Sequence, residues 1–149
     1  MPKFSESAWK VVTRELALST QGHDHVLDVT DALRALVAGS GVKEGQAVVF
    51  VPGATASVTT LEYEPGLLED LPALLEELMP AQRDWRHNRT WGDGNGASHL
   101  RAALIGPSLT VPVVNGELVL GTWQQAVVID HDRRPRERRV VLQIIGSAF

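Results

Sequence analysis

The chain has 149 residues, 44% of them hydrophobic, and a net charge of −4, which fits one globular domain with a real core. This charge argues against a general electrostatic attraction to nucleic acid or to an anionic membrane. The absence of cysteine excludes disulfides, cysteine–zinc sites and thiol nucleophiles, and no apolar run approaches the roughly 20 residues of a membrane span. We therefore expect a cytoplasmic protein that forms a single domain over residues 1–149.

The first part of the chain predicts two strands and a helix. Apolar and polar residues alternate from Trp9 to Ser19, which is typical of a strand, and a shorter strand is expected at His25–Val29. Thr30 or Asp31 can cap a helix that ends at the glycines of 39–41.

Two further strands and a helix follow. Gln46–Val51 is an apolar run rich in β-branched residues, and Ala56–Leu61 is expected to pair with it, with Pro65–Gly66 closing that pair. An amphipathic helix ended by Pro80 is predicted by leucines at helical spacing, and this stripe is expected to be core. These leucines are Leu67, Leu68, Leu71, Leu74, Leu75 and Leu78.

The last third of the chain is predicted to be mainly strands. A short helix, His99–Leu104, comes first and is broken by Gly106-Pro107. Asn115-Gly116 then indicates a hairpin between Leu109–Val113 and Leu118–Leu120. A second pair is expected between residues 124–130 and 139–145, around a loop at 131–137. The whole pattern predicts an α+β fold, a predominantly antiparallel, β-sandwich-like sheet with two or three helices.

The polar stretch from His87 to His99 is the strongest candidate for chemistry. Its glycines allow the backbone to fold tightly and to bring side chains together. Two imidazoles and the Asp93 carboxylate match the ligands of a divalent ion such as zinc, and they can also act as general acid and base near neutral pH. On the residues alone, an equally good interpretation is that Asp93, Asn95 and the glycines form turns and cap the next helix.

Three other segments contain candidate residues, and each also has a purely structural interpretation. The strand from Thr55 to Glu64 is rich in small and hydroxyl side chains, which leave room for a ligand. A carboxylate at its end, such as Glu62, could orient a histidine. The structural alternative is an ordinary strand whose threonines face solvent. Trp123 could wall a pocket and Gln124 could bind a ligand, or Trp123 could be core. The arginines of 133–139 could attract phosphate, or form a charged hairpin tip. His23 and His25 are interpreted as surface residues.

Three ordered motifs resemble the YjbQ family, whose members are often labelled secondary thiamine-phosphate synthases. The motifs are Gly-Asp-Gly-Asn-Gly-Ala-Ser-His-Leu-Arg at 92–101, Gly-Pro-Ser-Leu-Thr-Val-Pro-Val at 106–113 and Gly-Thr-Trp-Gln-Gln at 121–125. The resemblance covers nearly the whole chain, and includes the Glu-Tyr-Glu-Pro-Gly segment at 62–66. It implies an α+β fold, a homotrimer, and a pocket near subunit contacts that holds a divalent metal ion, zinc or magnesium. The implied activity joins a pyrimidine diphosphate to a thiazole phosphate with loss of pyrophosphate.

The resemblance and the residue types together give the predicted site. Its catalytic groups are His99, Asp93 and Glu62, and its metal ligands are His87 and His99. The predicted substrate-binding residues are Asn95, Trp123, Gln124 and Thr55. The chain departs from the family at Gly53-Ala54-Thr55-Ala56, where many members carry His-Thr-Ser-Ala, so one imidazole that could act as ligand or acid is missing.

Two hypotheses for the function follow. The first is a weak thiamine-phosphate-synthase-like enzyme with a metal-assisted pocket of His, Asp and Glu. The second is a non-catalytic trimer that binds a small phosphorylated metabolite or a metal ion. Only the first requires His87 and His99 to converge on one point.

Overall fold

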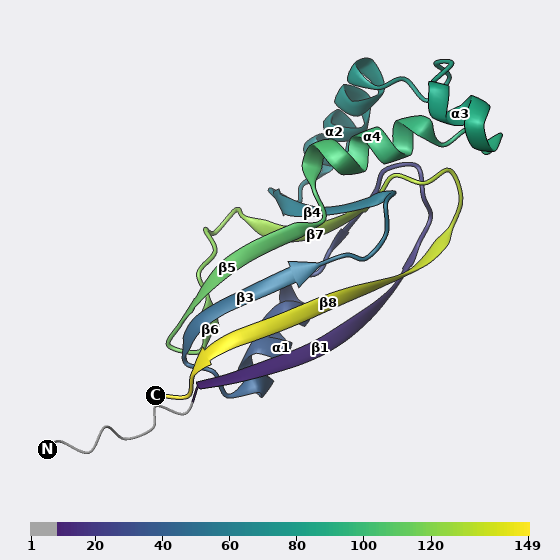
Figure 1. The fold of residues 1–149 in the computed structure, drawn as a ribbon. Helices are drawn as coiled ribbons and strands as arrows, with labels where there is room; N and C mark the ends of the chain where they lie inside the picture. The colour runs from purple at the N-terminus through teal and green to yellow at the C-terminus, as the bar shows by residue number, and fades with distance from the viewer. Residues whose placement is uncertain (1–8) are drawn as a thin grey trace, which may run out of the picture.

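The computed structural model describes residues 9–149, which form eight strands and four helices (Figure 1). The strands are β1 (Trp9–Thr20), β2 (His25–Asp28), β3 (Glu44–Phe50), β4 (Ala56–Leu61), β5 (Ser108–Val114), β6 (Glu117–Leu118), β7 (Gln125–Asp130) and β8 (Arg136–Ser147). The helices are α1 (Thr30–Ser40), α2 (Pro65–Leu78), α3 (Arg86–Trp91) and α4 (Gly96–Ile105).

The strands form two antiparallel sheets. The larger sheet has the order β1-β8-β3-β5-β6 and the smaller one the order β2-β7-β4. This confirms the predicted α+β fold with a sandwich-like, antiparallel arrangement, although the described residues contain four helices instead of two or three. The hairpin at Asn115-Gly116 is also confirmed, because Val114 pairs with Glu117 and Asn115 has the left-handed φ of 53° that this turn requires.

The main core lies between the two sheets. Inward-facing residues of the large sheet, such as Val49, Leu142 and Ile144, are fully buried against Val58 and Val128 of the small sheet. Helix α1 fills the rest of this space through Leu33 and Val37, which are both inaccessible to solvent. Alternation along β3 and β8 therefore reflects one buried face and one open face.

The small sheet is buried on both faces. Its second face carries Val26, Val127 and Ile129, against which Leu68 and Leu71 of α2 pack, together with Ile105 at the end of α4. This explains why β7 is a continuous apolar run instead of an alternating one. The layers are thus the large sheet, the core with α1, the small sheet, and the pair α2–α4.

Two predicted strand pairs are wrong. Strand β4 pairs with β7, and not with the strand before it, since residues 51–55 carry the chain across to the other sheet. Strands β7 and β8 also do not pair, because β8 lies between β1 and β3 in the large sheet. Alternation indicates which face of a strand is buried, but it carries no information on which strand lies beside it.

The helices differ from expectation at their ends. Pro65-Gly66 does not close a strand pair; it starts α2, where the Glu64 carboxylate accepts hydrogen bonds from the Gly66 and Leu67 amides. Helix α4 starts at Gly96, three residues before the predicted start, and α3 was not predicted. At the start of α1, the residue that accepts the Thr30 amide is Asp28, and neither Thr30 nor Asp31 acts as the cap.

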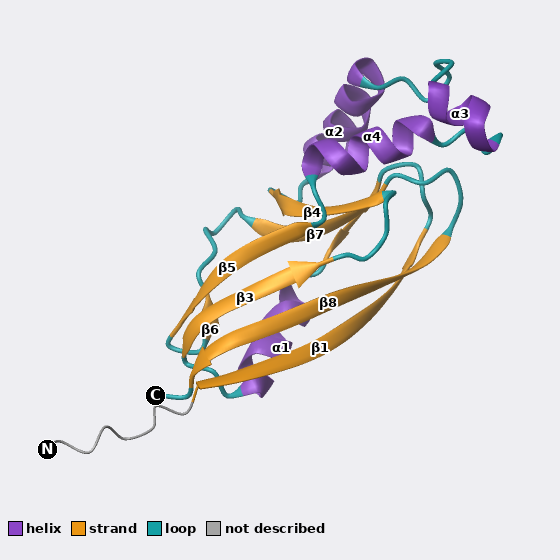
Figure 2. Cartoon of the chain, viewed as in Figure 1, coloured by secondary structure: helices purple, strands orange, loops and turns teal. Residues whose placement is uncertain are grey.

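The leucine stripe of α2 is only partly core. Leu75 is buried, and Leu68 and Leu71 pack against the small sheet, but Leu74 and Leu78 are more than half exposed. Helices α2, α3 and α4 gather at the end of the sheets opposite to the C-terminus (Figure 2). Within residues 9–149, no helix combines the length and apolar character that crossing a bilayer requires.

Candidate functional site

Two left-handed glycines bring α3 and α4 together. Helix α3 ends at Gly92, with φ of 69°, and Gly94 has φ of 67°, so the chain reverses within a few residues. The reversal is fixed by the Asn88 side-chain oxygen, which accepts a 2.8 Å hydrogen bond from the Gly96 amide. His87 on α3 and His99 on α4 therefore face each other.

The two histidines and the aspartate of this loop form one cluster. The ring centroids of His87 and His99 lie 4.4 Å apart, with the planes tilted by 43°. His87 Nδ1 lies 3.7 Å from a carboxylate oxygen of Asp93, and the Asn95 amide nitrogen, in its hydrogen-bonding orientation, donates to the same carboxylate at 2.9 Å. The predicted convergence of His87, Asp93, Asn95 and His99 is thus present.

His87 Nδ1 is the unusual atom of this cluster. It is buried and has no hydrogen-bond partner among the described residues. A buried polar atom without a partner costs free energy, so the described part of the fold leaves this nitrogen unsatisfied.

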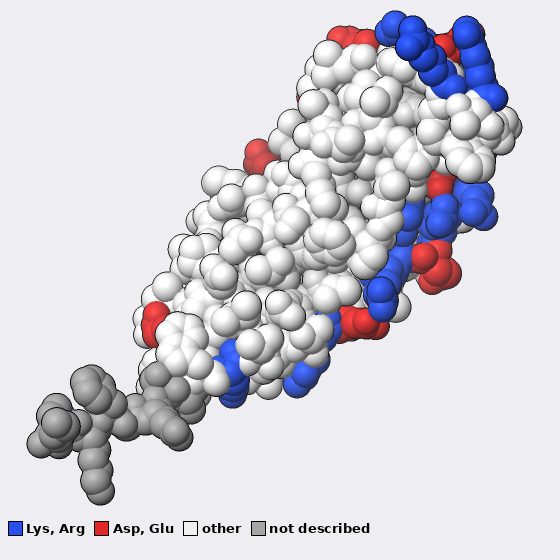
Figure 3. All heavy atoms as spheres, viewed as in Figure 1, with Lys and Arg blue, Asp and Glu red and all other residues white. Residues whose placement is uncertain are grey.

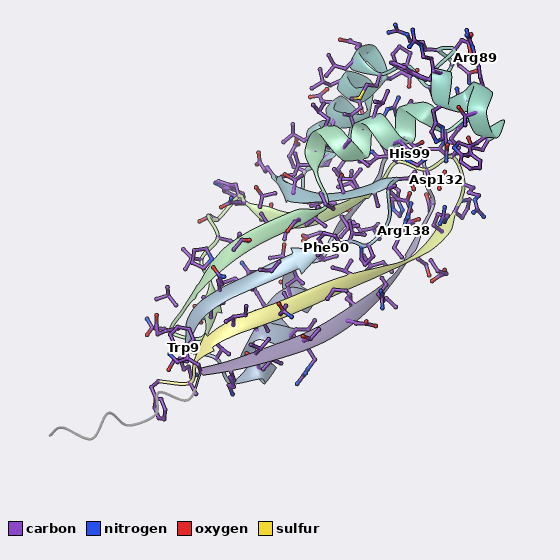
Figure 4. All side chains as sticks on the ribbon, viewed as in Figure 1. Trp9, Phe50, Arg89, His99, Asp132 and Arg138 are labelled. Carbon is purple, nitrogen blue, oxygen red and sulfur yellow. The ribbon has the colours of Figure 1, made fainter. Side chains whose placement is uncertain are left out.

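His99 borders two pockets. A cavity of about 490 Å³ is lined by His87 and His99 together with Arg83, Asp84, Trp85, Arg86, Gly96 and Leu100. A second cavity of about 310 Å³ lies on the other side of His99 and is lined by Gly53, Ala54, Ala56, Ala102, Ala103 and Pro107. Figure 4 shows His99 below α4, at the end of the sheets where Asp132 and Arg138 also lie.

A resident metal ion does not fit the donors of a single chain. Residues 9–149 bring together no group of three His, Cys, Asp or Glu side chains with metal-ligand geometry. A closed zinc site takes four ligands and an open catalytic site takes three. The divalent metal ion therefore stays a prediction.

Thr55 lies close to this cluster but its hydroxyl is already engaged. It is buried, accepts a 2.7 Å hydrogen bond from Arg138 and donates at 3.3 Å to Asp132. Such a residue holds the strand start in place instead of facing an open cavity.

The histidine pair is not joined by Glu62, Trp123 or Gln124, which lie in another part of the folded molecule. Glu62 and Trp123 line another cavity of about 300 Å³ with Asp28, Tyr63, Glu64, Thr122 and Gln125. Glu62 follows β4, whereas Ala56 at the start of β4 borders His99, and six strand residues span roughly 20 Å. The Gln124 side chain bonds to Thr60 and to the Gly121 amide. One chain therefore does not bring these residues to the histidine pair.

Sequence reasoning missed a buried polar chain beside the site. Ser57 Oγ lies 2.8 Å from His131 Nε2, and His131 Nδ1 lies 2.5 Å from a carboxylate oxygen of Asp24. Arg101 of α4 donates to the other Asp24 oxygen at 2.5 Å and also contacts Glu76. Ser57, His131, Asp24 and Arg101 are all at least 94% buried. The available signal was Asp130-His131-Asp132, three polar residues directly after a fully buried strand.

The arginine cluster is also not a simple hairpin tip. Arg138 is buried and pairs with Asp130 through bonds of 2.8 and 2.9 Å. Burial alone raises the pKa of Asp130, but hydrogen bonds from Arg138, Thr20 and the Asp132 amide outweigh it, so this pKa is lowered. The bonded carboxylate in turn raises the pKa of Arg138. Arg133 reaches the glycine loop, where it donates to the Gly94 carbonyl. His23 and His25 are confirmed as exposed and partly exposed residues.

Comparison with known proteins gives one consistent result. Residues 14–147 match the family model described as UPF0047 protein YjbQ-like. A UPF0047 protein of Methanothermobacter thermautotrophicus is 37% identical, with 93% of this chain and 94% of the relative covered, and one of Mycobacterium tuberculosis is 41% identical, with 80% and 88% covered. The crystal structure of a YbjQ-like protein of unknown function from Sulfolobus solfataricus matches with a TM-score of 0.89 at 34% identity, covering 93% of this chain and 99% of the other. A hypothetical protein of Aeropyrum pernix gives 0.86 at 38%, covering 91% and 99%.

Proposed function

The chain belongs to the UPF0047 family of YjbQ-like proteins, and from this premise we propose that it is an enzyme whose reaction centre is the histidine pair on α3 and α4. The specific reaction we propose is thiamine-phosphate formation, in which a pyrimidine diphosphate and a thiazole phosphate are joined and pyrophosphate is released. The protein would act in the cytoplasm.

The single observation that carries the proposal is the contact between the His87 and His99 rings at the wall of one cavity. Both rings border a cavity of about 490 Å³, which is large enough for a heterocycle with a phosphate group. An imidazole at the wall of a cavity can accept a proton from a ligand there or give one to it. The Asp93 carboxylate, 3.7 Å from His87 Nδ1, holds the side of the ring that faces away from solvent.

The proposed reaction needs acid assistance at the leaving group. The thiazole nitrogen attacks the methylene carbon of the pyrimidine, the bond from that carbon to the diphosphate oxygen breaks, and pyrophosphate leaves with the bonding pair. His99 would serve as the general acid that donates a proton to that oxygen, which lowers the cost of the charge that develops there. Arg83 and Arg86, which line the same cavity, supply positive charge for the phosphates.

The alternative is a binding protein without catalysis, and one observation favours it. Gly53 leaves the cavity next to His99 walled by small apolar side chains, without the imidazole that many family members place there. A pocket of that kind, with His87 and His99 on one side only, could hold a small phosphorylated metabolite without transforming it.

A measurement of turnover distinguishes the enzyme from the binding protein. Product formation from the two precursors is measured for the wild type, for His99→Gln and His87→Gln, and for the matched control His25→Gln, which removes an imidazole outside the cavity. The enzyme proposal predicts a loss of kcat of about 10²-fold or more for the two site variants and little change for the control. Equal turnover in all four proteins, or none in the wild type with intact ligand binding, contradicts catalysis at this pair.

We also propose that the protein is a homotrimer, supported by the open face of the large sheet. Figure 3 shows this face almost without charge over its centre, with Lys, Arg, Asp and Glu along the β1 edge and around the helices. Val11, Phe50, Val141 and Ile145 lie on the outward side of their strands, and Val11 and Phe50 are 61% and 41% exposed. An uncovered apolar sheet face is typical of a protein interface. A neighbouring subunit could also bring its Glu62 and Trp123 to a histidine pair.

Native mass measured by light scattering tests the assembly. We expect three times the chain mass for the wild type and a monomer for Phe50→Asp, since a carboxylate cannot be buried unpaired in that face. The control is Leu104→Asp, a change at an exposed apolar residue of α4 on a different surface. A wild-type monomer contradicts the trimer.

A further inference from the structure

A further pocket, distinct from the three described above, lies on the opposite side of α4 from the histidine pair. It has a volume of about 310 Å³ and shares no lining residue with the cavity beside His87. Its walls come from α2, from the start of α4, and from the two loops that hold Asp24 and His131. These lining residues are His23, Asp24, Pro72, Glu76, Ala81, Gln82, Gly94, Ala97, Ser98, Arg101, His131 and Arg133.

Arg133 and His23 lie at the rim of the pocket, where both residues are exposed. The Arg133 guanidinium donates one bond, to the Gly94 carbonyl at 3.0 Å, and the residue is otherwise exposed. Its remaining N–H groups are free to bind a ligand, since a guanidinium carries five donors. His23, also exposed, adds an imidazole on the same pocket.

The wall formed by α4 offers donors without partners. The side chain of Asn95, the residue before the helix, does not cap it. The Ala97 and Ser98 amides belong to the first turn, in which no intrahelical acceptor is available. Ser98 is 97% buried, lines the pocket, and its hydroxyl makes no hydrogen bond with the residues that the structure describes. Because Ser98 lines the pocket, its hydroxyl can bond to a ligand bound there.

The two carboxylates of the pocket are engaged on the side of Arg101. Asp24 is held by Arg101 and by His131, and Glu76 is held by Arg101 and by the Ala81 amide. Arg101 thus divides its one positive charge between two carboxylates. Arg133 pairs with no carboxylate of residues 9–149, and its guanidinium lies next to a helix start that favours negative charge.

We propose that this pocket binds the phosphate group of a small phosphate monoester, held by Arg133, by the Ser98 hydroxyl and by the first amides of α4. A phosphate has the oxygens to accept from all three, and charge-assisted bonds to a guanidinium are the strongest of these. The inference stands apart from the proposed reaction, because it concerns binding in a separate cavity and is measured as binding.

The proposed phosphate site is tested by calorimetric titration of the full chain. Phenyl phosphate and inorganic phosphate are titrated separately. We expect saturable binding of the monoester to the wild type, at least about tenfold weaker affinity for Arg133→Gln, and a weaker affinity also for Ser98→Ala. The matched control is Arg134→Gln, which removes the same charge from the neighbouring exposed residue outside the pocket, and whose affinity should stay within about twofold of the wild type. Ser98→Ala leaves the bond from Arg133 to Gly94 intact, so it separates ligand binding from loop positioning.

Three results of the titrations with the monoester would overturn the proposal. They are no saturable binding to the wild type, equal weakening in Arg133→Gln and Arg134→Gln, and unchanged affinity in both Arg133→Gln and Ser98→Ala. Tighter binding of inorganic phosphate than of phenyl phosphate would also overturn it, since the site would then be one for the free ion. Loss of turnover in His99→Gln with this binding unchanged separates the pocket from the reaction centre.

Discussion

Replacing Arg138 with methionine should cost about 3–5 kcal/mol of the free energy of unfolding. Arg138 donates two bonds to Asp130, which is completely inaccessible to solvent, and a third to Thr55. Methionine fills much of the same volume but leaves the Asp130 charge buried without its cation, and breaking a buried pair in this way costs that amount. Domains of this size are stable by about 5–15 kcal/mol, so the loss is large but measurable.

Urea denaturation with linear extrapolation measures this loss, and a double-mutant cycle with Asp130→Asn isolates the pair. The Arg138→Met/Asp130→Asn protein should lose clearly less than the sum of the two single losses, because the second change removes the unpaired charge. A cost below about 1 kcal/mol for Arg138→Met, or strict additivity in the cycle, would refute the reasoning.

The Arg138–Asp130 pair should also make the folding stability depend on pH. Because the pKa of Asp130 is lowered in the folded state, its contribution is fully present above the ordinary carboxyl pKa of about 3.9 and is lost as the pH falls through the lower folded value. Without Arg138, burial dominates and raises this pKa, so the folded mutant takes up a proton more readily than the wild type. The stability difference between the two proteins should therefore narrow on acidification. A difference that stays constant from pH 7 to pH 3 contradicts the assigned cause.

Four substitutions give further tests by urea or thermal denaturation. Gly45→Ala should destabilise by several kcal/mol or prevent folding, because its Cβ would lie 2.1 Å from the Ile145 carbonyl oxygen, whereas Gly121→Ala, whose Cβ has 3.6 Å of clearance, should be tolerated. Equal losses for the two would contradict the close strand packing. Gly39→Ala should stabilise by about 0.5–1 kcal/mol, since Gly39 lies in a helix with open space around it, and a loss would show that the space is occupied. Glu64→Ala should destabilise by about 0.5–2 kcal/mol through loss of the α2 cap, and an unchanged midpoint would count against that cap.

The fold class was predictable from local patterns, but the pairing of strands was not. Alternation located β1, and Asn115-Gly116 located a hairpin, because both signals come from neighbouring residues. That β8 lies between β1 and β3 follows from contacts between segments about 100 or more residues apart. Helix α3 also escaped prediction, since six polar and aromatic residues show no periodicity and its end depends on two left-handed glycines.

The candidate site was predictable only where its residues lie close together in the sequence. His87 and His99 were identified from one short segment, which folds back on itself as expected. Glu62 and Trp123 were assigned to the same pocket by resemblance, yet they lie near the far end of the small sheet from His99 in one chain. The hydrogen-bonded series that links Ser57, His131, Asp24 and Arg101 was not predicted. Its members come from four separate parts of the sequence, and only the folded structure brings them together in the interior.

The most direct test of the histidine pair is the NMR spectrum of the imidazoles during titration with the pyrimidine diphosphate. The chain has five histidines, so each signal can be assigned by substitution. A reaction centre at His87 and His99 predicts that these two signals move together and saturate with the ligand, while the signal of His25 stays in place. Saturable binding that leaves the His87 and His99 signals unchanged would contradict the account.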